Sequence, residues 1–155
     1  VVWVDESGEH GISCALSDQS NGIRWFAGTY KHTLALGDGP MAGEMNTAII
    51  IASQGIGDGN SYAARICNEL NVTVGGVTYS DWYLPSMEEV GILYQNRTLI
   101  DSVATANGGQ TFSQNLYWSS TEANDIEARR RNFATGQFPQ TSKNSINNVR
   151  AVRAF

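Results

Sequence analysis

Three consecutive arginines near the end of the chain are the residues best suited to chemistry. Arg129, Arg130 and Arg131 are followed by Lys143 with no acidic residue between them. An arginine guanidinium is planar and always charged, so it binds sulfate or phosphate through two parallel hydrogen bonds. In a strand, side chains alternate, which places Arg129 and Arg131 on one face and Arg130 on the other. We therefore predict a solvent-facing anion site at the three arginines, extended by Lys143.

The charge of the chain is divided unevenly. The 155 residues carry a net charge of −5, which argues against nucleic acid as a partner. Residues 1–127 hold all 15 acidic residues and four basic ones, a sum of −11, whereas residues 128–155 hold six basic residues and no acidic one. Two explanations stay open: the basic residues form an anion site, or they pair with acids of the same fold or of a neighbouring subunit. Arg150 and Arg153 diverge in a regular strand, so at least some of the six are structural.

The sequence offers little for catalysis. His10 and His32 are the two histidines, both in turn-like or loop-like segments, and no Gly-x-Ser-x-Gly motif accompanies them. A glycosidase needs only a pair of carboxylates. Four acidic residues qualify by type: Glu88, Glu89, Glu122 and Asp125. Glu88 and Glu89 are better explained as residues of a first helical turn, where negative charge complements the helix dipole. We expect a protein that is not an enzyme.

We expect no metal and no cofactor. Cys14 and Cys67 lie 53 residues apart, unlike the short spacing of zinc ligands. They form one disulfide in an oxidising compartment or remain two buried thiols, and both alternatives stay open. Asp58, in the Gly55–Asn60 segment, could supply an oxygen ligand to calcium, but the spaced acids of an EF-hand loop are missing. We interpret this segment as a flexible connector.

Strand-like patterns occupy both ends of the chain. Val1–Asp5 and Gly11–Leu16 flank a polar, glycine-containing stretch and predict a β-hairpin. Near the other end, aromatic and β-branched residues predict strands over Leu116–Ser120, Arg129–Ala134 and Asn148–Phe155. The termini are therefore expected to lie close together in one sheet.

Helical patterns fill the middle of the chain. Pro40 stands where a first-turn proline is favoured, ahead of a helix over Met41–Gln54. A second helix is predicted from Ser61, as its cap, to about Leu70. The third has the clearest start, because Ser86 and Glu89 have the spacing of a capping box.

These elements predict one α+β domain spanning residues 1–155. No apolar run approaches the roughly 20 residues that cross a bilayer, and no targeting signal is visible. The chain opens directly into the strand-like Val1–Val4 run, so we expect a piece of a longer protein.

Several motifs, in order, carry a resemblance to a known family. They are Trp3–Gly11, Ala15–Gln19, Tyr79–Glu89, Leu93–Tyr94, Tyr117–Glu122 and Val149–Arg153. Together they cover nearly the whole chain, which resembles the C-terminal domain of the Legionella collagen-like protein and its bacterial relatives. Two positions depart from the family pattern: Tyr83 stands where an arginine is usual, and Met87 begins a helix that usually opens on lysine.

The resemblance implies a C-type-lectin-like fold with antiparallel sheets, two to three helices and adjacent termini. It also implies attachment to a trimerising collagen-like stalk at the bacterial cell surface. The function it implies is that of an adhesin that binds sulfated glycosaminoglycans of host cells and supports biofilm. A protein-binding or self-assembly module without glycan binding is the alternative, since lectin-like folds host unrelated functions. Trp82 and Trp118 are expected to be core residues, not sugar contacts.

Overall fold

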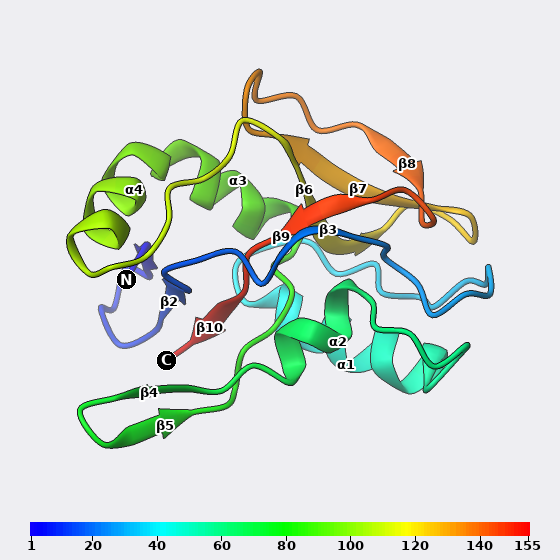
Figure 1. Ribbon diagram of the computed structural model, residues 1–155, viewed down its shortest axis with the longest axis horizontal. Coiled ribbons are helices and arrows are strands. Elements are labelled where there is room, and N and C mark those ends of the chain that lie inside the picture. Colours follow the sequence, from blue (N-terminus) through cyan, green and yellow to red (C-terminus); the bar gives the residue numbers. More distant parts are fainter.

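The computed structural model describes residues 1–155 and contains four helices and ten strands (Figure 1). The helices are α1 (Ala42–Gln54), α2 (Ala63–Asn68), α3 (Met87–Gln95) and α4 (Arg97–Ala106). The strands are β1 (Trp3–Val4), β2 (Gly11–Cys14), β3 (Ser20–Ile23), β4 (Val72–Val74), β5 (Val77–Tyr79), β6 (Leu116–Glu122), β7 (Glu127–Asn132), β8 (Gln140–Ser142), β9 (Asn147–Val149) and β10 (Val152–Ala154). The predicted α+β class is confirmed, with four helices instead of two to three.

The strands form three sheets. The largest has the order β3-β9-β6-β7-β8, the second has the order β1-β2-β10, and β4 pairs only with β5. The pairs are antiparallel except for β6 and β9, which run parallel. The first and last strands of the chain both pair with β2, and the Gly11 N–H donates to the Phe155 carbonyl at 2.9 Å. The termini therefore lie close together, as expected (Figure 1).

Strand β6 supplies side chains to two buried clusters. Trp118 belongs to the first, which also contains residues of α1 and α2, whereas Tyr117 belongs to the second, with residues of α3 and α4. Neighbouring side chains of a strand point to opposite faces. In Figure 1, α3 and α4 accordingly lie above α1 and α2, and strands β3 and β9 of the five-stranded sheet pass between the two pairs. Residues Tyr117–Glu122 are all buried, as expected for a strand covered on both faces.

The start of α3 follows the sequence signal, but the start of α1 does not. The Ser86 hydroxyl accepts the Glu89 N–H at 3.2 Å, and the Glu89 carboxylate accepts the Ser86 N–H at 2.7 Å. This is the predicted capping box. Helix α1 begins after Met41, whose φ of 69° is left-handed, so Pro40 precedes the cap and is not in the first turn.

Three further boundaries differ from prediction. The cap of α2 is Tyr62, not Ser61, and it makes no side-chain capping bond. The third predicted helix is followed at once by α4, with Asn96 between them. The predicted last strand is divided at Arg150 and Ala151, because β9 and β10 join different sheets. No helix combines the length and the apolar character that crossing a membrane requires.

Candidate functional site

Strand β7 contains the three arginines, and their side chains alternate between its two faces, as predicted. Arg130 lies opposite Trp118 of β6, and Arg131 lies opposite Tyr117. Directly opposed residues of an antiparallel pair share a face of the sheet. Arg131 therefore lies on the face covered by α3, and Arg130 lies on the other. Arg129 shares the face of Arg131 by alternation, and all three residues are half-buried.

Arg131 lies between two aromatic rings. Its guanidinium carbon is 5.4 Å from the ring centroid of Tyr94 and 5.4 Å from that of Phe138. Its Nη1 donates to the Gly136 carbonyl at 3.2 Å. Arg97, at the start of α4, also stacks on Tyr94, at 4.0 Å. Sequence analysis did not single out Arg97, because only the packing of α3 against β7 brings it to the arginine strand.

The other two arginines have few partners. Arg130 Nη1 donates to Asn147 Oδ1 at 3.0 Å, whereas its Nε is buried without a hydrogen bond. The side chain of Arg129 makes no hydrogen bond or ion pair, although its backbone carbonyl accepts the Ser119 hydroxyl at 2.9 Å. None of the three arginines forms a salt bridge, so their positive charge is uncompensated within the fold.

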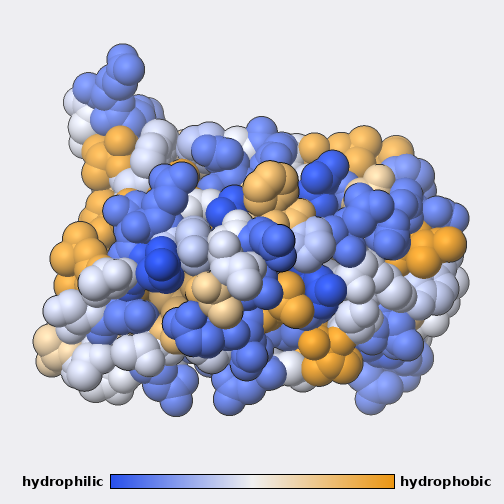
Figure 2. All heavy atoms as spheres, turned by 90° about the horizontal axis from the view of Figure 1, so that it is seen from above, coloured by the Kyte–Doolittle hydropathy of each residue, from blue (hydrophilic) through white to orange (hydrophobic).

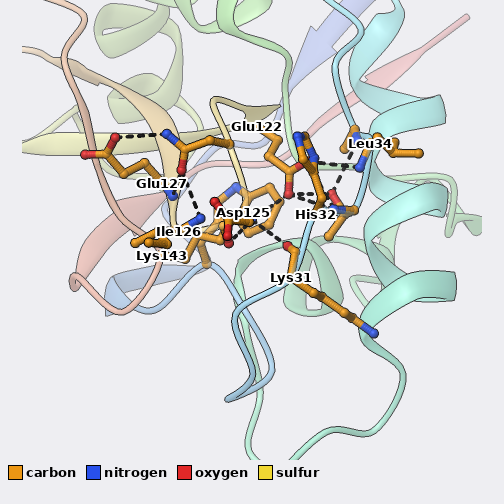
Figure 3. A network of polar contacts seen from close by, with 12 residues as sticks. Lys31, His32, Leu34, Glu122, Asp125, Ile126, Glu127 and Lys143 are labelled. Carbon is orange, nitrogen blue, oxygen red and sulfur yellow. Dashed lines mark hydrogen bonds and ion pairs between the residues drawn. The ribbon is translucent and has the colours of Figure 1, made fainter.

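Lys143 is not available to the predicted anion site, because its ammonium is buried. Neither Lys143 nor Glu122 has an exposed side chain. The Lys143 ammonium donates to Glu122 Oε1 at 2.5 Å and to the carbonyls of Lys31 and Asp125 at 2.9 Å each (Figure 3). Three acceptors satisfy all three protons of an ammonium group. Contrary to prediction, the Lys143 ammonium binds acceptors inside the fold and does not extend an anion site at the three arginines.

The Glu122 carboxylate accepts hydrogen bonds from the segment before α1. It accepts the N–H of Thr33 at 2.8 Å and that of Leu34 at 2.9 Å, and His32 Nδ1 lies 2.5 Å from Oε2 (Figure 3). Burial alone would raise the pKa of Glu122, but hydrogen bonds from Lys143, Thr33 and Leu34 lower it. The carboxylate is charged and fully engaged, so it is poorly suited to acid or base catalysis.

Arg150 and Arg153 each pair with an acid far away in the sequence. Arg150 is buried, and its Nε donates to Asp18 Oδ1 at 2.7 Å. Arg153 makes two hydrogen bonds to Asp81, at 2.7 and 2.6 Å. Both arginines are therefore structural, as predicted for at least some of the six basic residues. Pairing with acids of the same fold explains Lys143, Arg150 and Arg153, whereas the arginines of β7 have no acidic partner.

Glu89 is a structural carboxylate. Besides capping α3, its Oε1 accepts the Met41 N–H and the Tyr83 hydroxyl, both at 2.8 Å. It thereby ties the left-handed turn before α1 to the start of α3. Burial raises the pKa of Glu89, outweighing the hydrogen bonds from these neutral donors. Glu88 is exposed in the same first turn, as expected for a residue that complements the helix dipole.

The remaining candidates belong to the structural framework. Cys14 and Cys67 are free thiols that pack against different buried clusters. Trp82 and Trp118 are buried in the first cluster, as predicted. Asp58 forms an ion pair with Arg24. No group of three or more His, Cys, Asp or Glu side chains could hold a metal ion.

Two mainly apolar hollows meet at Leu16, at the end of the molecule that holds the termini. The first is lined in part by Val2, Leu99 and Val103, and the second by residues that include Val74. Leu16, Leu99, Val103 and Val74 are all exposed. Figure 2 shows a mainly hydrophilic face, with hydrophobic residues in small groups and along the left edge, which corresponds to the α4 end in Figure 1.

Comparison with known proteins identifies the family of the chain. No curated protein matches the chain. The family model of the Lcl C-terminal domain matches residues 15–153. This stretch includes the first buried cluster, all of the second except Ile12, the arginine strand and the acids that pair with Lys143, Arg150 and Arg153. The match confirms the resemblance carried by the sequence motifs. The chain therefore belongs to the Lcl C-terminal domain family.

Proposed function

We propose that this domain is the head of a bacterial surface adhesin and binds sulfated glycosaminoglycans of host cells through Arg129, Arg130 and Arg131. Membership of the Lcl C-terminal domain family supports an Lcl-type adhesin domain. One observation carries the glycan assignment: the arginines of β7 are the basic residues of the C-terminal segment that have no carboxylate partner. A guanidinium without a carboxylate partner keeps its paired N–H donors for sulfate.

The three arginines contribute unequally to this proposal. Arg129 and Arg131 share one face of β7, so a single polymer chain can contact both. Arg130 lies on the opposite face and already donates to Asn147. We therefore expect Arg129 and Arg131 to supply most of the binding free energy, and Arg130 to contribute less.

The proposal includes the presentation of the domain outside the cell. A trimer on a collagen-like stalk would offer the arginine surface three times, and several weak sites on one polymer increase the overall affinity without new contacts. A C-type-lectin-like fold, with its adjacent termini, would suit a head attached at one end of a stalk. Adhesion and biofilm formation would follow from the same multivalent contact.

We also propose that the domain is not an enzyme. Two of the four carboxylates that qualified by type have structural partners: Glu89 caps a helix and Glu122 is held by Lys143. Incubation with heparin, followed by size analysis of the polymer, should show no cleavage. Shortened chains would contradict this proposal.

The decisive experiment compares two double variants for retention on heparin. Arg129→Ala/Arg131→Ala should lose most of the retention seen with the wild-type domain. Lys31→Ala/Arg65→Ala removes the same amount of charge from an exposed and a half-buried position outside β7 and is the matched control. Retention should require sulfate and decrease with salt. Each variant should keep its free energy of unfolding within about 1 kcal/mol, as expected of surface substitutions. A stable Arg129→Ala/Arg131→Ala variant with unchanged retention would contradict the assignment.

The apolar hollows beside Leu16 favour a second candidate function, a protein-binding or self-assembly module. Exposed apolar patches rimmed by polar residues mark sites of protein interaction. Leu99→Glu, on the exposed side of α4, should then lower the oligomeric mass or abolish partner binding. If heparin retention is absent and Leu99→Glu changes the oligomeric mass, this candidate replaces the first.

A further inference from the structure

Two guanidinium groups and two aromatic rings form an alternating row beside β7. The order is Arg97, Tyr94, Arg131 and Phe138, with ring-to-guanidinium distances of 4.0, 5.4 and 5.4 Å. Arg97 comes from α4 and Tyr94 from α3, whereas Phe138 follows β7. The row therefore combines three parts of the fold and includes a basic residue from outside the basic C-terminal segment.

The row is held in place by the packing around Tyr94. The Tyr94 ring makes an edge-to-face contact with buried Phe133, with centroids 5.5 Å apart. On another side, Gly136 has a left-handed φ of 79°, and a Cβ there would lie 2.8 Å from the Tyr94 hydroxyl. Only glycine fits this turn without displacing the ring. Because Tyr94 is fixed, both guanidinium planes that stack on it are partly ordered before any ligand binds.

Both guanidinium groups keep unused hydrogen-bonding capacity. Arg97 Nη1 donates to the Tyr94 carbonyl at 2.7 Å, and Arg131 Nη1 donates to the Gly136 carbonyl at 3.2 Å. These are their only side-chain hydrogen bonds within the protein, although each guanidinium has five N–H donors. Arg131 Nε is buried without a hydrogen-bond partner, so Nη2 is the Arg131 nitrogen that keeps its donors for a ligand. Neither group forms a salt bridge, so two positive charges border one aromatic ring without an ion-pair partner. The acidic residue that acts on Arg131 is Glu88, exposed in the first turn of α3.

Phe138 adds an apolar surface at the end of the row. Its side chain is 60% exposed. Covering a phenyl ring with a ligand removes apolar surface from water, which is favourable. The apolar C–H face of a pyranose ring matches such a surface, and sulfate groups at the ring edge would lie next to Arg131.

We propose that this row is the subsite that holds a sulfated pyranose of the polymer. Adjacent sulfate groups bind Arg97 and Arg131, and the sugar face packs on Phe138. The inference rests on the proposed function and extends it, because it assigns a binding role to Arg97 and Phe138. Arg129 continues the same face of β7 and would contact the next part of the polymer.

Binding of a heparin oligosaccharide, measured by calorimetry on the whole domain, tests the subsite. Arg97→Gln should weaken binding about tenfold, the value of a charge-assisted hydrogen bond. Arg97→Lys keeps the charge but loses the planar fork and the stacking on Tyr94, so most of the loss should remain. Phe138→Ala should weaken binding about threefold. Arg65→Gln is the matched control, a helical arginine with an acidic partner, Glu69, and should bind as the wild type does.

The outcomes separate this inference from the proposed function. Wild-type affinity in both Arg97→Gln and Phe138→Ala, together with loss in Arg129→Ala/Arg131→Ala, would overturn the subsite and leave the glycan assignment standing. Equal losses in Arg97→Gln and Arg65→Gln would show a diffuse charge effect and would also overturn it. No binding of heparin by the wild-type domain would overturn both. Phe138 is exposed, so its variant tests the subsite even if substitution of Arg97 disturbs α4.

Discussion

The ammonium of Lys143 lies 2.5 Å from Oε1 of Glu122, and neither side chain is exposed to solvent. This pair joins the end of β6 to the turn between β8 and β9, and through Glu122 it also holds the Thr33 and Leu34 amides. Removing two charges from water costs free energy that close pairing and additional hydrogen bonds must offset. Both conditions are met here, so the pair orders three separate segments beside the arginine strand.

Breaking this pair should strongly destabilise the domain. Lys143→Met should lower the free energy of unfolding by about 3–5 kcal/mol, because it leaves the Glu122 carboxylate buried without its cation. Glu122→Gln/Lys143→Met should cost less than the sum of the two single substitutions. Urea unfolding of the four proteins measures the coupling.

The exposed pair between Arg65 and Glu69 serves as the control for this cycle. Arg65→Ala should cost less than about 1 kcal/mol, as surface ion pairs usually do. If Lys143→Met is no more destabilising than Arg65→Ala, the pair does not have the structural role assigned to it. Where Lys143→Met remains folded, it should retain heparin binding, since Lys143 does not reach the surface.

Acidification should remove the stabilisation that Glu122 provides. The pKa of Glu122 is lower in the folded protein than its ordinary value of 4.5. A carboxyl group of this kind stabilises the fold above its unfolded pKa and loses that contribution as pH falls through the folded pKa. The free energy of unfolding should therefore decrease below a pH of about 4.5, as followed by urea unfolding over an acid series.

Glu122→Gln should show a weaker decrease over the same acid range. Part of the decrease should remain, because Asp58 and Asp81 also have lowered pKa values through their hydrogen bonds with Arg24 and Arg153. Identical acid profiles for the wild type and Glu122→Gln would argue against a charged Glu122 in the folded domain.

Gly43→Ala should destabilise the domain although alanine favours helices. A Cβ at Gly43, in α1, would overlap Glu89 Oε2 and lie 2.7 Å from both the Leu84 carbonyl oxygen and the Ser86 nitrogen. We expect a loss of about 1–3 kcal/mol, typical of overpacking. At Gly91, in α3, an added Cβ would meet only the end of the Arg131 side chain, at 3.4 Å. Gly91→Ala should therefore be close to neutral, and equal thermal shifts for the two variants would contradict this packing.

Both cysteines should titrate as free thiols after unfolding and react slowly before it. Burial raises the pKa of Cys14 to about 12 and also raises the pKa of Cys67. Since the thiolate is the reactive species, a thiol reagent should modify neither residue quickly in the native domain. In urea without reductant, the count should reach two thiols per chain. A count of zero would show that the two cysteines form a disulfide.

Local features of the chain were readable from the sequence because their causes are local. The capping box of α3 needs only Ser86 and Glu89, three residues apart, and the alternation of Arg129 to Arg131 follows from strand geometry. The β4-β5 hairpin was missed although Gly75 and Gly76 are a favoured two-residue turn between β-branched runs. The sequence contains no comparable signal for the break between α3 and α4, because residue 96 is an asparagine and has neither glycine nor proline beside it.

The sequence by itself determined the α+β class, the strand that carries the arginines and the excess of positive charge in the last part of the chain. Only the tertiary structure decided which of those charges remain free. In the sequence, Lys143 and Arg131 are equivalent basic residues, but folding places Lys143 against Glu122 and leaves Arg131 between aromatic rings without an acid. It also brings Arg97 to the same ring, Tyr94. Charge is a property of each residue, whereas its compensation depends on partners that only the folded chain brings within a few ångströms.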